Sequence, residues 1–115
     1  PFACDLAEPN AAETLARFAE ERFGRIDTWV NNAAAAMLAP LETVTIDEHR
    51  RIFDVGYFGY VAGSLAAVAR LKRDGGALVN VGSVLSNRAA PLQGPYSAMK
   101  AAVLAFTDAL RMELE

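Results

Sequence analysis

Short apolar segments alternate along this chain with longer segments of helical periodicity. The pattern predicts the end of an apolar strand at residues 2–4 and two complete buried strands at residues 26–30 and 77–81. A helical pattern follows each of these segments, over residues 10–23, 47–72 and 94–114. This order is typical of an α/β fold, in which a parallel sheet has helices on both faces. We therefore predict a doubly wound parallel sheet, with residues 1–115 forming part of a single domain.

The sequence also marks the ends of the helices. Asn10 followed by Glu13, and Thr45 followed by Glu48, match the capping-box pattern of a helix start. Gly24 suits the position just after a helix end. The first two helices are each expected to bury an apolar stripe. In the first helix the stripe comprises Leu15, Phe18, Ala19 and Phe23. In the second helix it comprises Ile52, Val55, either Phe58 or Gly59, Ala62, either Leu65 or Ala66, and Ala69.

The long central helix contains three glycines, Gly56, Gly59 and Gly63. A glycine costs about 1 kcal/mol relative to alanine inside a helix. Three of them indicate close packing against a neighbouring backbone or room for a ligand. We expect close packing for Gly59 and Gly63.

Composition excludes several classes of protein. The net charge is −3, without the cluster of Lys and Arg that a nucleic-acid partner would need. The uncharged run from Val55 to Ala69 is shorter than the roughly 20 apolar residues of a membrane-spanning helix. Cys4 is the single cysteine, so neither an intrachain disulfide nor a multi-cysteine metal site is predicted, and no metal is expected. Cys4 is expected to pack as a small hydrophobic residue in a reducing, cytoplasmic protein.

Small polar residues follow each predicted strand. Asp5, the pair Asn31 and Asn32, and Ser83 all occupy such positions. Ligands of open α/β sheets bind outside the carboxyl ends of the strands, so these residues are candidates for one binding crevice. Asn31 is expected to satisfy backbone groups of its loop rather than to contact a ligand.

Tyr96 and Lys100 lie on the helix that leaves the third strand and are four positions apart, so they share a helix face. A nearby positive charge lowers the pKa of a phenol. A phenol adjusted in this way can give or take a proton at a substrate oxygen. The sequence therefore predicts acid/base chemistry at Tyr96.

With these residues in place, the chain resembles the middle of a short-chain dehydrogenase/reductase over essentially its whole length. The resemblance rests on Asp5, on residues 23–27 before Asn31-Asn32-Ala33-Ala34, and on the spacing of Ser83, Tyr96 and Lys100. It implies a Rossmann-like fold and an oxidoreductase that uses NAD or NADP to interconvert an alcohol and a carbonyl compound. Tyr96 would be the general acid/base, assisted by Lys100, and Ser83 would hold the substrate oxygen.

The same resemblance implies a set of cofactor contacts. Asp5 and the backbone of Leu6 would meet the adenine, and Asn32 and Ala33 would border the adenosine and ribose. Lys100 would hydrogen-bond the nicotinamide ribose, beside Tyr96. The long and last helices would form the interface of a homodimer or homotetramer.

The sequence departs from the family in three places. Ala34 replaces the usual glycine, and Gly56 stands where many members have an asparagine that distorts the helix and holds a proton-relay water. We expect Gly56 either to allow a bend or to leave space for a water held by backbone carbonyls, and any relay to use water and main chain. The glycine-rich phosphate loop and the substrate lid are not in this sequence, so the 115 residues alone are expected to be inactive. The alternatives are a sugar-nucleotide epimerase or dehydratase, and a truncated, non-catalytic binding or scaffold protein.

Overall fold

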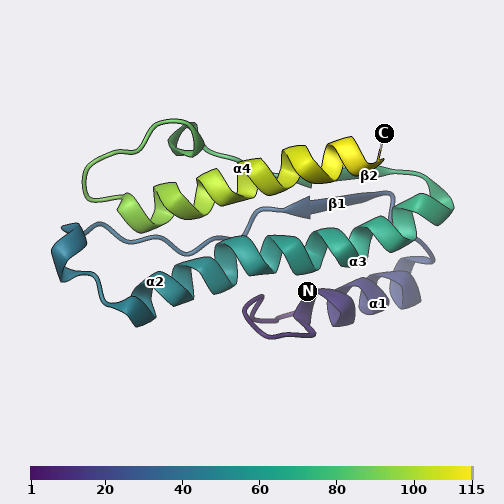
Figure 1. Cartoon of the computed structure of the whole chain (residues 1–115). Coiled ribbons are helices and arrows are strands. Elements are labelled where there is room, and N and C mark those ends of the chain that lie inside the picture. The colour runs from purple at the N-terminus through teal and green to yellow at the C-terminus, as the bar shows by residue number, and fades with distance from the viewer. Residues whose placement is uncertain (115) are drawn as a thin grey trace.

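The predicted alternation of strands and helices is present in the computed structural model, which describes residues 1–114 (Figure 1). The helices and strands are α1 (Ala11–Phe23), β1 (Thr28–Asn31), the 3-10 turn η1 (Leu41–Thr43), α2 (Ile46–Phe53), the π-helical turn η2 (Asp54–Phe58), α3 (Gly59–Asp74), β2 (Ala77–Asn80), the 3-10 turn η3 (Val84–Ser86) and α4 (Gly94–Leu114). The two complete strands are each placed within two residues of their predicted limits.

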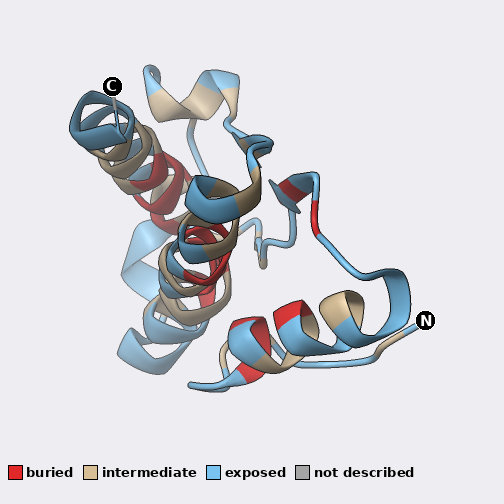
Figure 2. Cartoon of the chain, turned by 90° about the vertical axis from the view of Figure 1, so that its right-hand side faces the viewer, coloured by how far each residue is buried: buried red, intermediate tan, exposed pale blue. Residues whose placement is uncertain are grey.

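Strands β1 and β2 pair in parallel, from Thr28 opposite Ala77 to Asn31 opposite Asn80. Helix α3 packs against both strands, and α1 packs against α3. Figure 2 shows the buried residues on the inward sides of the helices. The α/β class with a parallel sheet is therefore confirmed. Val30 and Val79 are 54% and 43% exposed, so the second face of the sheet is not covered by helices within residues 1–114.

The amino-terminal segment differs from its prediction. Residues 1–5 form no strand, and Cys4 is exposed rather than packed. A strand needs a hydrogen-bonded neighbour, and residues 1–114 supply none beside this segment. Phe2 instead stacks on Phe18 of α1, with ring centroids 4.9 Å apart.

Two of the three predicted helix-end signals are confirmed. The Thr45 hydroxyl accepts a hydrogen bond from the Glu48 amide at 3.2 Å, and the Glu48 carboxylate accepts one from the Thr45 amide at 2.8 Å. Gly24 follows α1 with φ of 86°. Asn10 precedes α1, but its side chain makes no capping bond, because its ψ of 7° lies outside the extended region that an N-cap residue adopts.

Helices α2 and α3 form one continuous helix, Ile46–Asp74, which is widened by the π turn η2 around Gly56. The predicted distortion at Gly56 is thus confirmed. The predicted inner stripe is confirmed at Ile52 and, of each pair of alternatives, at Gly59 and Ala66. The other two alternatives, Phe58 and Leu65, are 57% and 59% exposed. The stripe is wrong at Ala69, which is exposed. The residues that turn inward are mostly small: Gly56, Gly59, Tyr60, Gly63, Ser64, Ala66 and Ala67.

This continuous helix is also long and apolar enough to cross a membrane. In the structure 44% of its apolar window is buried inside the chain's own fold. The same helix packs against α1, β1, β2 and α4.

Two clusters of buried side chains hold the elements together. The first joins α1, β1 and α3 and comprises Ala12, Ala16, Ile26, Trp29, Ala66 and Ala67. The second joins the long helix to α4 and comprises Ile52, Tyr60, Met99 and Val103. In α1 the small residues Ala12 and Ala16 face inward with Leu15 and Ala19, whereas Phe23 is 74% exposed, which corrects the predicted stripe.

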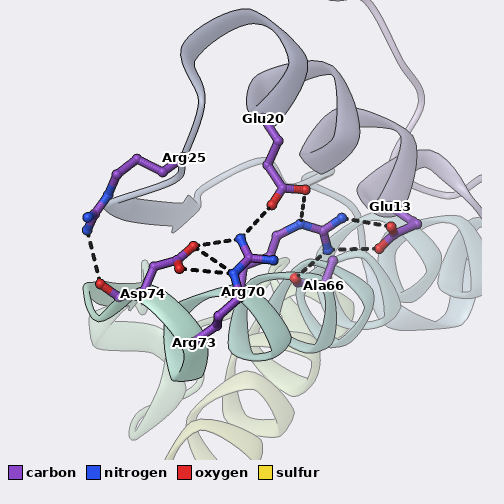
Figure 3. A network of polar contacts seen from close by, with 7 residues as sticks. All are labelled: Glu13, Glu20, Arg25, Ala66, Arg70, Arg73 and Asp74. Carbon is purple, nitrogen blue, oxygen red and sulfur yellow. Dashed lines mark hydrogen bonds and ion pairs between the residues drawn. The ribbon is translucent and has the colours of Figure 1, made fainter.

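Arg70 of α3 links α3 to α1 through two carboxylates (Figure 3). Its guanidinium group pairs with both oxygens of Glu13, at 2.8 and 3.0 Å, and with Glu20 at 2.8 Å. The Arg70 side chain is only 12% exposed and the Glu20 side chain 24%, so their bond is partly shielded from water, whereas Glu13 is 52% exposed. Hydrogen bonds from Arg70 lower the pKa of Glu13 and of Glu20.

Replacing Arg70 by Met is expected to lower the free energy of unfolding by about 2 kcal/mol at neutral pH, because charge-assisted bonds to two carboxylates are lost. Arg73→Met should have a smaller effect, since Arg73 is 60% exposed. Carboxylates with a lowered pKa stabilise the fold above their ordinary pKa and lose that effect as the pH falls. The difference between wild type and Arg70→Met should therefore shrink below about pH 4. Urea unfolding at neutral pH and below about pH 4 measures this difference. Equal losses of unfolding free energy in Arg70→Met and Arg73→Met at neutral pH would contradict this account.

Candidate active site

The predicted chemistry gathers where β2 ends and α4 begins. Lys100 of α4 is only 2% exposed. Its ammonium group donates hydrogen bonds to the Val81 carbonyl at 2.6 Å and to the Tyr60 hydroxyl at 3.0 Å. Burial of this charge lowers the pKa of Lys100. An ammonium has three donors, so one remains without an acceptor among residues 1–114.

Tyr96 lies one turn before Lys100 on α4, as predicted. The Lys100 nitrogen is 5.9 Å from the centroid of the Tyr96 ring and 4.7 Å from that of Tyr60. The Tyr96 ring is half-buried against the cluster that contains Met99 and Tyr60. The structure thus brings Tyr96 and Lys100 together, and the catalytic role of Tyr96 stays a prediction.

Ser83 precedes the turn η3, which packs against α4. Its side-chain oxygen accepts a hydrogen bond from the Leu85 amide at 3.1 Å, and its own amide donates to the Ser86 hydroxyl at 3.3 Å. Because the Ser83 oxygen acts here as an acceptor, its O–H remains able to donate to a ligand. Its predicted substrate contact is compatible with this arrangement and stays a prediction.

Asn31 is a structural residue, but its side-chain partners belong to the strands and to α3, whereas bonds to the backbone of its own loop were expected. Its side chain is 5% exposed and accepts a hydrogen bond from the Trp29 indole at 2.8 Å. Its amide nitrogen donates to Asn80 at 2.7 Å and to Ser64 at 3.1 Å. These bonds join β1, β2 and α3. A side chain at position 63 would collide with the Asn31 amide, so the expected close packing at Gly63 is confirmed.

The residues predicted to border the cofactor lie at the end of β1 and beside it. Leu6, Asn32 and Ala33 line one hollow of about 300 Å³, which also runs along β1 from Thr28 to Asn31 and beside Leu15 and Ala19 of α1. The backbone and side chain of Leu6 also lie against Gly59, where an added Cβ would be 3.2 Å from the Leu6 Cβ, as expected for close packing. Asp5 lies outside this hollow.

Asp5 fixes the amino-terminal segment to α2. One of its oxygens accepts a hydrogen bond from the Ala7 amide at 3.0 Å, and the other pairs with Arg51 at 3.0 Å. The Ala7 amide and the Arg51 guanidinium lower the pKa of Asp5. The carboxylate therefore stays ionised and able to accept a further hydrogen bond from a ligand.

The space beside Gly56 is filled by Met99. A Cβ added at Gly56 would lie 2.6 Å from both the sulfur and the terminal methyl group of Met99. Met99 is fully buried, so its side chain cannot swing into solvent. The room that a side chain at position 56 would need is thus taken by α4, whereas a relay through water and main chain stays a prediction.

Gly56→Ala is expected to lower the free energy of unfolding by about 1–2 kcal/mol, because the new methyl group overpacks against Met99. In a Met99→Ala background the same change should become neutral or stabilising, since the methyl group enters the space that Met99 leaves. Wild type, the two single variants and the double variant form a double-mutant cycle, in which urea unfolding measures the free energy of each protein. Effects that add within about 0.5 kcal/mol would contradict the contact.

Sequence reasoning missed Tyr60 and the Val81 carbonyl as partners of Lys100. Tyr60 lies one turn after Gly56 on the long helix, and helical spacing alone does not indicate a contact with Lys100. The contact spans 40 positions along the chain, and no short motif encodes it.

A sequence profile described as short chain dehydrogenase matches residues 1–115. The uncharacterized oxidoreductase YxnA of Bacillus subtilis is 39% identical over 113 residues, covering 96% of this chain and 32% of that protein. Dehydrogenase/reductase SDR family member 7B of Mus musculus is 32% identical over 112 residues, covering 96% of this chain and 35% of that protein. Diacetyl reductase [(S)-acetoin forming] of Staphylococcus epidermidis is 30% identical over 115 residues, covering 98% of this chain and 45% of that protein.

The fold is also similar to a solved structure. The alcohol dehydrogenase of the archaeon Thermococcus sibiricus, complexed with 5-hydroxy-NADP, superposes with a TM-score of 0.89 at 28% identity. The match covers 95% of this chain and 46% of the archaeal chain. The chain thus spans less than half the length of each of these proteins.

Proposed function

Because the chain belongs to the short-chain dehydrogenase family, we propose that the protein containing it is an NAD(P)-dependent oxidoreductase that interconverts an alcohol and a carbonyl compound. The observation that carries this proposal is the buried Lys100 ammonium beside Tyr96, with one donor left for a ligand. A buried charge retains a free donor at high cost unless a ligand takes it up. The solved relative in complex with an NADP analogue supports the choice of cofactor.

The residues present fit a nicotinamide cofactor. The remaining donor of Lys100 suits a ribose hydroxyl, and the hollow lined by Leu6, Asn32 and Ala33 offers an apolar wall and backbone groups for the adenosine. The Asp5 carboxylate can accept a hydrogen bond from the adenine amino group. When bound, the cofactor supplies or takes the hydride.

The chain's own residues would manage the proton. Tyr96 would donate a proton to the carbonyl oxygen during reduction and take it back during oxidation. The Ser83 hydroxyl would donate a hydrogen bond to that same oxygen, which stabilises the negative charge that develops on it. Lys100 would place positive charge beside the Tyr96 ring and hold the ribose.

The proposal is tested with the complete protein and a panel of ketones, aldehydes and alcohols. Oxidation of NADH or NADPH should depend on the carbonyl compound, and cofactor binding should be measurable without it. A protein that binds neither cofactor and turns over none of the panel would overturn the proposal. We expect residues 1–115 alone to show no turnover.

The remaining expectations belong to the complete protein as well. We infer a small alcohol or ketone as substrate, a cytoplasmic location and a homodimer or homotetramer. Sedimentation as a monomer at micromolar concentration would contradict the oligomer.

A further inference from the structure

Tyr60 is the largest fully buried side chain of the molecule described, and its hydroxyl lies against the Lys100 ammonium. We propose that Tyr60 is a positioning residue that aims Lys100 at its ligand, in the absence of any side chain at Gly56. This inference rests on the proposed function for its catalytic consequence. The contact itself stands on the geometry alone.

The three groups at this point form a closed set of hydrogen bonds. Lys100 donates to the Val81 carbonyl at 2.6 Å and to the Tyr60 hydroxyl at 3.0 Å. The Tyr60 hydroxyl donates to the same Val81 carbonyl at 3.2 Å. Because Lys100 has no acceptor atom, the Tyr60 proton must point to Val81 and its lone pair to Lys100.

The titration state of Tyr60 supports this arrangement. Burial, with a smaller effect of Tyr96, raises the pKa of Tyr60 to about 12. Tyr60 therefore keeps its proton at neutral pH and can both donate and accept. The phenols Tyr60 from α3 and Tyr96 from α4 are the titratable groups that face Lys100.

Tyr60 is itself fixed from both sides. Its ring packs in the cluster with Ile52, Met99 and Val103, and its own carbonyl accepts a hydrogen bond from the Asn31 amide at 3.3 Å. Tyr60 is thereby fixed at its backbone to Asn31 of β1 and at its hydroxyl to Val81, the residue that follows β2.

Two fixed bonds determine the direction of the third donor of Lys100, because the three N–H bonds of an ammonium are arranged tetrahedrally. With Val81 alone, the end of the Lys100 side chain could still pivot about that one hydrogen bond and carry the third N–H with it. Tyr60 removes that freedom. Since Met99 occupies the space beside Gly56, the side chain at position 56 cannot share this task.

The test compares Tyr60→Phe with Tyr57→Phe in the complete protein, because each variant removes one hydroxyl from the same long helix. NMR of the protein with isotope-labelled lysines follows the titration of Lys100, whose signal is identified by its absence from Lys100→Arg. Loss of a hydrogen bond to the charged form should raise the acid dissociation constant of Lys100 about tenfold in Tyr60→Phe. The kcat/KM of Tyr60→Phe should fall roughly 10- to 100-fold, and the alkaline limb of its pH profile should move to lower pH than in wild type. Tyr57→Phe should match wild type in both.

Thermal unfolding of each variant separates positioning from a merely structural role. A Tyr60→Phe protein with a lower Tm but unchanged Lys100 titration and pH profile would overturn the proposal. If wild type shows no turnover while the Lys100 titration still shifts in Tyr60→Phe, the proposed function fails and the contact with Tyr60 stands.

Discussion

Tyr96→Phe is expected to lower kcat of the complete protein by about 10²- to 10⁴-fold, the range that a positioned general acid or base contributes. The variant keeps the ring, which packs beside Met99 and Tyr60, so the fold should be preserved. It removes only the hydroxyl that would exchange a proton with the substrate oxygen. Cofactor affinity should stay within a few-fold of wild type, because Lys100 and the hollow at the end of β1 are unchanged.

Steady-state kinetics and cofactor titration of the same preparations check this result. Tyr57→Phe serves as the matched control, because the Tyr57 ring packs against Phe53, Phe58 and Phe106, and the hydroxyl that bonds to Lys100 is that of Tyr60. Turnover of Tyr96→Phe within tenfold of wild type would assign the proton transfer to another group. An equal loss in Tyr57→Phe would point to a general effect on folding.

Asn31→Ala is expected to produce the largest loss of stability, about 3 kcal/mol in the free energy of unfolding. The change leaves the Trp29 indole N–H without an acceptor in the interior, which costs about 1–3 kcal/mol. It also removes the shortest hydrogen bond to Asn80, whose side chain keeps its bonds with Ser64 and Thr107. It also opens a cavity between β1 and α3. The effect should appear in the midpoint of urea unfolding with an unchanged slope.

Asn87→Ala is the matched control for Asn31→Ala, because Asn87 is exposed after η3. Its free energy of unfolding should lie within about 0.5 kcal/mol of wild type. If Asn31→Ala were equally mild, the side-chain bonds that join the two strands to α3 would not stabilise the fold.

Local patterns predicted the elements that local interactions determine. The capping box at Thr45 and the glycine stop at Gly24 depend on residues within one turn, and both are present. Residues 2–4 have an apolar strand pattern, but strand formation depends on a neighbouring strand rather than on composition. Pattern alone therefore placed a strand where the chain is irregular.

The candidate site shows the same limit. Spacing along one helix correctly placed Lys100 beside Tyr96. It did not reveal that the lysine ammonium bonds to Tyr60 and Val81, because these partners come from other elements. Likewise, the glycine at position 56 indicated a distortion, but not that Met99 of α4 would fill the space.

The π turn η2 has a consequence for how related sequences should be compared. An α-helix turns by about 100° per residue, so residues spaced by four drift around a regular helix. Ile52, Gly56, Tyr60 and Ser64 are nevertheless all buried, because the wider turn between Asp54 and Phe58 takes up part of that drift. Gly59, Gly63, Ala66 and Ala67 are buried as well, so this four-residue repeat accompanies the ordinary helical spacing and does not replace it. Relatives that keep a tyrosine at the third position of that repeat are where the same lysine contact should be sought.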